Sequence, residues 1–173
     1  MQMTKRQLFV VAALALVLCC FRSQAQEVEV ENVPNDILQS VELGQFAKSY
    51  TLDGSMNPFY LRGDFDGDGK IDYAIRIKSK TTNESGMAIW LSSLHKFLFL
   101  GAGVPFKVSG SSVSNLDFLD TWQVYGKKPV ERAVESGPRP HLLGEAILAG
   151  KRDSASGLIY WSGKSFSWYQ QGD

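Results

Sequence analysis

Four aspartates within nine residues form the part of this sequence whose residue types and spacing could do chemistry. Asp64, Asp66, Asp68 and Asp72 occupy positions one, three, five and nine of the segment 64–72. Calcium takes roughly six to eight oxygen ligands at about 2.3–2.6 Å, and carboxylates at alternate positions of a tight loop can converge on it. Without a cation, such carboxylates repel one another. We therefore expect a calcium site formed by these four side chains and the backbone carbonyl of Lys70.

The glycines of the segment and the residue at its twelfth position refine this expectation. Gly67 and Gly69 permit a sharp bend because they carry no Cβ. Position twelve is Ile75, where an EF-hand has a bidentate Glu, so we expect a modest calcium affinity of ~10⁻⁵–10⁻³ M. We favour calcium over magnesium, which requires stricter octahedral geometry. The alternative to an ion site is an acidic turn closed by its own Asx hydrogen bonds.

The segment from Gly63 to Ile75 resembles the loop-then-strand calcium site of FG-GAP/VCBS-type repeats, which occur in integrin-like propeller blades. The resemblance implies the same five calcium ligands. A propeller needs several blades, and this chain has one such motif, so the resemblance does not imply a propeller. The chain after its N-terminal segment also resembles small bacterial exported proteins with one such loop and a Tyr-Trp-x-Gly-Lys ending. That second resemblance implies no activity.

The N-terminus has the three-part pattern of a secretory signal peptide. Lys5 and Arg6 precede an almost unbroken apolar run at 8–20, and Ser23-Gln24-Ala25 places small residues before a cut after Ala25. The apolar run is shorter than the roughly 20 residues that span a bilayer. We expect residues 1–25 to be a signal peptide, and the protein to be periplasmic or secreted with no membrane span after cleavage.

Both cysteines, Cys19 and Cys20, lie in this segment. Bacterial lipoproteins usually have a small residue before the modified cysteine. Here Leu18 precedes Cys19, and Cys19 precedes Cys20, so we favour cleavage over lipidation. The exported chain would then contain no disulfide and no thiol nucleophile.

The charge balance argues against a nucleic-acid partner. The chain has 18 basic and 18 acidic residues, and the first 25 residues hold three of the basic ones and no acid. The rest therefore carries 15 basic and 18 acidic residues, and it shows no basic stripe of the kind that binds nucleic acid.

The elements that must position the aspartates follow from hydrophobic spacing. Apolar residues at helical spacing predict a helix over Pro34–Lys48, weakened near its end by Gly44. Alternation of apolar residues predicts a strand over 71–78 directly after the loop. Further strands are expected at 87–91, 97–100 and 142–149, and a final aromatic hairpin at 157–161 and 165–169.

Two connecting regions complete the expected fold. Residues 101–115 are rich in glycine and serine and are expected to be loop, whereas 116–125 fit either a strand or a short helix. We expect residues 26–173 to form a single α+β domain. Its N-terminal helix would pack on one mostly antiparallel sheet of about six strands, which ends in the aromatic hairpin.

The expected function is that of a non-enzymatic binding or interaction protein of the cell envelope with a structural calcium ion. Its partner would be another exported protein or a glycan. One alternative is a calcium-dependent carbohydrate or surface adhesion module, in which the ion or the hairpin rings touch the ligand. The candidate rings are Tyr160, Trp161, Trp168 and Tyr169.

A hydrolase with a cryptic site is the second alternative. The two histidines, His95 and His141, lie far apart in the sequence and outside any metal-binding or catalytic motif. The sequence also has no G-x-S-x-G elbow. We therefore name no catalytic residue.

Overall fold

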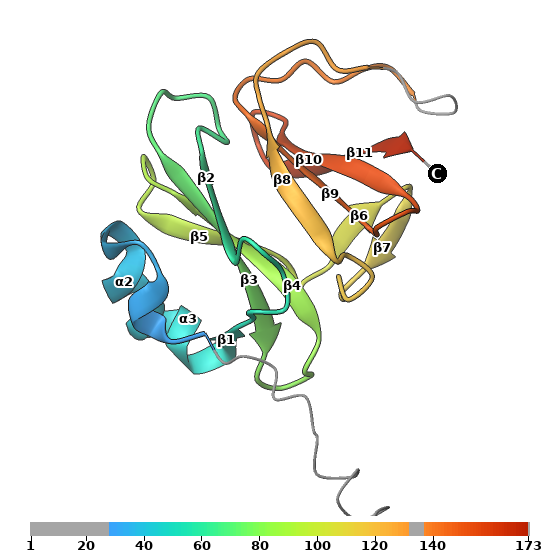
Figure 1. The fold of residues 1–173 in the computed structure, drawn as a ribbon. Helices are drawn as coiled ribbons and strands as arrows, with labels where there is room; N and C mark the ends of the chain where they lie inside the picture. Colours follow the sequence, from blue (N-terminus) through green and yellow to red (C-terminus); the bar gives the residue numbers. More distant parts are fainter. Residues whose placement is uncertain (1–27, 132–136, 173) are drawn as a thin grey trace, which may run out of the picture.

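The computed structural model describes residues 28–131 and 137–172 (Figure 1). The predicted signal peptide lies outside these residues. Among the described residues, no helix has the length and apolar character needed to cross a membrane. The helical elements are η1 (Val30–Asn32), α2 (Asn35–Glu42) and α3 (Gly44–Ser49).

The first sheet contains five strands. They are β1 (Tyr50–Leu52), β2 (Tyr60–Gly63), β3 (Asp72–Ser79), β4 (Ser85–Leu91) and β5 (Lys96–Gly101). All pairings are antiparallel, and β1 and β2 both pair with β3, at its end and its beginning respectively. Consequently β3 has strand partners on both sides over most of its length, and its first residue, Asp72, pairs with Gly63 across the aspartate loop.

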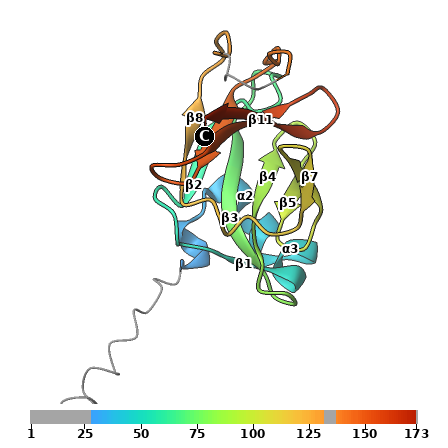
Figure 2. The ribbon, with the colours of Figure 1, turned by 90° about the vertical axis from the view of Figure 1, so that its right-hand side faces the viewer.

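The second sheet contains four antiparallel strands in the order β11-β10-β9-β8. Their bounds are β8 (Thr121–Tyr125), β9 (Ala146–Gly150), β10 (Ser156–Trp161) and β11 (Phe166–Gly172). A two-stranded sheet, β6 (Phe106–Val108) with β7 (Ser111–Val113), lies beside β11 (Figures 1 and 2).

The two larger sheets face each other across the main core. Buried side chains of β3, β4 and β5 on one sheet meet those of β8 to β11 on the other, together with Phe65 of the aspartate loop. Met87, Ile89, Ile147 and Ile159 in this core are completely buried. Burial of this apolar area, at about 25 cal/mol per Å², is the main stabilising contribution.

The opposite face of the first sheet is covered by the two short helices. Ile37 and Val41 of α2 and Phe46 of α3 are buried with Ile75 and Ile77 of β3. Alternation along β3 therefore sends Tyr73, Ile75 and Ile77 to one core, and Ala74 to the other. Both faces of this strand are buried.

The predicted α+β fold class is wrong, because the protein is mostly β. Residues 28–131 and 137–172 form 11 strands in three sheets in place of one sheet of about six. The predicted helix over Pro34–Lys48 is two short helices, interrupted where Leu43 is extended and Gly44 has a φ of 68°. An L residue rarely adopts a positive φ, and glycine adopts it readily. The first helix therefore ends just before Gly44.

The predicted loop over 101–115 is also wrong in part, since it contains the β6–β7 hairpin. Phe106 and Val108 point toward the main core and hold this hairpin in place. The ambiguous segment 116–125 ends in strand β8. Short strands flanked by glycine and serine leave too little alternation to be recognised locally.

The C-terminal hairpin is confirmed. Ile159 pairs with Trp168 and Trp161 pairs with Phe166, so these four side chains share one face. Gly163 has a φ of 91° in the turn, which suits glycine. The four candidate rings do not share a face: Trp161 and Trp168 pack toward the main core, whereas Tyr160 and Tyr169 pack in a separate cluster.

A buried charge lies in the middle of β3. Arg76 is 2% exposed, and its Nε lies 3.5 Å from Oδ2 of Asp53. Its Nη2 donates a hydrogen bond of 2.9 Å to the carbonyl of Leu116. Burial lowers the pKa of Arg76, and the charge of Asp53 acts against this. Arg76 thus connects the first sheet to the chain that leads into β8.

We expect Asp53→Ala to cost about 3–5 kcal/mol of unfolding free energy, because it leaves the guanidinium of Arg76 buried without its counter-charge. The double variant Asp53→Ala/Arg76→Met should lose less than the sum of the two single variants. Urea unfolding of all four proteins measures this coupling, and additive losses would contradict the pairing.

Candidate metal centre

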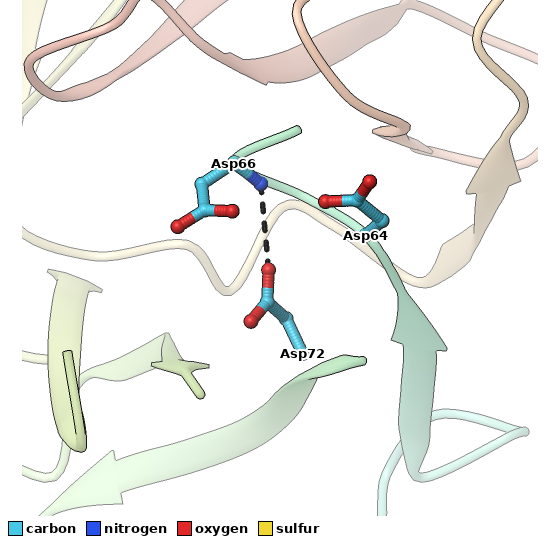
Figure 3. Close-up of side chains that lie close together, drawn as sticks. All are labelled: Asp64, Asp66 and Asp72. Atoms are coloured by element: carbon cyan, nitrogen blue, oxygen red, sulfur yellow. Dashed lines mark hydrogen bonds between the residues drawn. The ribbon is translucent and has the colours of Figure 1, made fainter. Parts of the chain in front are cut away.

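The aspartate loop joins β2 to β3 and brings three of the four predicted carboxylates together. One carboxylate oxygen from each of Asp64, Asp66 and Asp72 lies within 4.8 Å of the other two (Figure 3). Two oxygens that bind the same calcium ion at about 2.3–2.6 Å are at most about 5 Å apart. The three side chains therefore have a spacing that a single calcium ion can bridge.

The other two predicted ligands are not part of this group. Asp68 is exposed, and its Oδ1 accepts a hydrogen bond of 2.8 Å from the backbone N–H of Lys70. This hydrogen bond holds the pKa of Asp68 below its usual value. Lys70 is itself exposed. Ligation by Asp68 and by the Lys70 carbonyl stays a prediction.

Asp72 is completely buried and anchors the loop to the first sheet. Its Oδ2 accepts hydrogen bonds from the backbone N–H groups of Phe65, at 3.0 Å, and Asp66, at 3.4 Å. Its Oδ1 accepts one of 2.9 Å from the N–H of Ser92. Burial raises the pKa of Asp72 to about 6, and the charge of Asp66 adds to this rise. A cation at this position would favour the ionised form.

The loop is also closed by its own side-chain hydrogen bonds. One is an Asx turn, as the alternative to an ion site predicts, in which Oδ1 of Asp66 accepts a hydrogen bond of 3.2 Å from the N–H of Asp68. Oδ1 and Oδ2 of Asp64 accept hydrogen bonds from the N–H groups of Gly67, at 2.7 Å, and Gly69, at 3.1 Å. Gly67 and Gly69 have φ values of 83° and 84°, which explains why glycine is used at both positions. An ionised carboxylate offers about four acceptor sites, so these hydrogen bonds leave oxygen lone pairs for a cation.

Two serines between β4 and β5 also contact the site, and sequence reasoning missed them. Ser93 Oγ donates a hydrogen bond of 3.2 Å to Oδ2 of Asp66. The hydroxyl of Ser92 donates to the carbonyl of Ile71. These serines lie 20 or more residues beyond the loop, and the pairing of β3 with β4 brings them to it.

The second sheet holds the loop from its other side. The N–H of Asp64 donates a hydrogen bond of 2.9 Å to Oε2 of Glu145, and the N–H of Glu145 donates one of 2.6 Å to the Asp64 carbonyl. The backbones of Gly67 and Gly144 lie so close that a Cβ on Gly144 would be 2.6 Å from the Gly67 nitrogen. Glu145 directly precedes β9, so the loop connects the two sheets.

These contacts give no local sequence signal, because Asp64 and Glu145 are 81 residues apart. Comparisons with protein-family models, curated proteins and solved structures found no match. The argument for a metal centre therefore rests on the aspartate loop and its surroundings in this structure.

We expect Gly144→Ala to lower the unfolding free energy by about 1–3 kcal/mol or more, because the new methyl group would overlap the backbone of the aspartate loop. Gly126→Ala is the matched control, since a Cβ there meets nothing within 4 Å. Chemical denaturation of both variants measures the difference. Equal stability of the two variants would show that the loop does not pack against Gly144.

Proposed function

We propose that this protein is an exported calcium-binding domain whose ion is structural, and that it acts as a non-enzymatic binding or interaction protein of the cell envelope. The observation that carries the proposal is the convergence of Asp64, Asp66 and Asp72 within 4.8 Å in a loop of calcium-type spacing. Calcium is a hard cation that prefers such carboxylate oxygens.

The surroundings of the loop support a structural role for the ion. Asp72 lies at the start of β3 in the first sheet, and Asp64 exchanges two hydrogen bonds with Glu145, directly before β9 of the second sheet. An ion between these carboxylates would strengthen the connection between the sheets. It would also offset the repulsion between Asp66 and the buried Asp72.

The surroundings of the histidines favour a binding protein over a hydrolase. His95 and His141 are both exposed, and His95 lies edge-on to Trp90 with ring centroids 6.2 Å apart. Neither lines the open groove that β5, the β6–β7 hairpin and β11 form. A partner in the envelope, either a protein or a glycan, therefore fits better than a substrate for hydrolysis.

We expect calcium to raise the melting temperature and Asp66→Ala to abolish the rise, because the substitution removes one of the three converging carboxylates. At tenfold its Kd, calcium would add about 1.4 kcal/mol to the unfolding free energy. For a chain of this size, that corresponds to a shift of about 3–6 °C. Thermal melts in chelator and in millimolar calcium measure the effect.

Asp153→Asn is the control, since it removes an exposed carboxylate outside the loop. It should leave the calcium-induced shift unchanged. A melting temperature that does not respond to millimolar calcium would refute the metal site, and magnesium in place of calcium should give a smaller shift.

A further inference from the structure

The structure contains a large open groove beside the edge strand of the second sheet. Its volume is about 1470 Å³, and its walls come from β5, the β6–β7 hairpin, the β9–β10 connection and β11. Binding pockets for small molecules are typically about 300–1,000 Å³. The groove is larger than this and open, so it suits an extended polymer better than a single small molecule.

The charged residues that line this groove are all basic in the part of the chain that the structure describes. Lys107, Lys151 and Lys164 contribute to its lining, and among residues 28–131 and 137–172 no Asp or Glu does. All three lysines are exposed. They come from three separate parts of the chain, in a protein whose segment 26–173 has more acidic than basic residues. A site with charges of one sign concentrates ligands of the opposite sign, so the groove favours an anion.

Trp168 of β11 provides a fixed aromatic surface in the groove. Its ring lies against Gly157 of β10, where a Cβ would overlap the six-membered ring. Its Nε1 donates a hydrogen bond of 3.0 Å to Oε1 of Gln170, and the same oxygen accepts one of 2.7 Å from Ser109 of the β6–β7 turn. The half-buried indole is thus held in one orientation before any ligand binds, which reduces the entropic cost of binding.

These features favour a sugar polymer over a peptide. A peptide that added a strand to β11 would need its outer backbone edge. The β6–β7 hairpin lies beside that edge and is connected to it through Ser109 and Gln170. A pyranose ring instead needs an apolar surface to stack on and polar groups around it. Trp168 supplies the surface, and Ser154, Ser165 and Ser167 add hydroxyl groups to the lining.

We propose that this groove binds an anionic oligosaccharide, with a sugar ring on Trp168 and its carboxylate groups beside the lysines. The proposal rests on the binding role proposed above and not on the calcium loop. A failure of the calcium site would be detected in the melts. A failure of the groove would be detected in a ligand titration carried out in chelator.

The probe is hexagalacturonate, with its neutral methyl ester as the matched control. We expect the acid to bind in chelator and the ester to bind at least about tenfold more weakly, since the ester loses its attraction to all three lysines and a factor of ten is about 1.4 kcal/mol. Lys151→Glu and Lys164→Glu should each lower the affinity for hexagalacturonate by a similar factor. Lys48→Glu, which lies outside the groove, should leave this affinity unchanged. Calorimetry measures these affinities.

Tryptophan fluorescence gives a second readout. The acid should change the emission of the protein and of Trp161→Phe, but not that of Trp168→Phe. Equal binding of acid and ester, or unchanged binding by the two groove lysine variants, would overturn the proposal. So would complete loss of binding in chelator, which would place the ligand at the aspartate loop. Binding of poly-L-glutamate as tight as that of the acid would also overturn it, in favour of an acidic peptide.

Discussion

The close backbone contact between Gly67 and Gly144 is the constraint on which the rest of the structure depends. It lets the aspartate loop of the first sheet lie directly against the start of β9 in the second sheet. This close packing of the loop against β9 allows the two hydrogen bonds between Asp64 and Glu145. A side chain at either glycine would separate the sheets at this corner, and the main core between them would lose its contact with Phe65.

Strand β3 carries two buried ionisable side chains, Arg76 and Asp72, and only Arg76 has a counter-charge beside it. Arg76 lies beside Asp53 and donates to the Leu116 carbonyl, so its charge is compensated within the fold. Asp72 accepts backbone N–H groups, but the charge that acts on it is that of Asp66, which has the same sign. Burial without a counter-charge raises the proton affinity of a carboxylate. A cation bound at the aspartate loop would give Asp72 a counter-charge, as Asp53 does for Arg76.

Prediction from the sequence succeeded where the signal was local and strong. The final aromatic hairpin was expected at 157–161 and 165–169, and β10 pairs with β11 there. The fold class was wrong because the short strands of the β6–β7 hairpin and of β8 have little alternation. The expected single helix was also wrong, because the extended Leu43 and the positive φ of Gly44 separate α2 from α3. Helices this short depend on packing against a sheet, which local propensity does not reveal.

The sequence by itself determined the aspartate spacing and the glycines that let the loop bend. The reason is that the hydrogen bonds inside the loop join residues at most seven positions apart. Only the tertiary structure decided which carboxylates converge, and that Ser93 and Glu145 complete their surroundings. It also decided the groove, because Lys107, Lys151 and Trp168 come from β6, the β9–β10 connection and β11, which are far apart in the sequence. Contacts between distant segments depend on how whole sheets pack, and this packing leaves no pattern within any one segment.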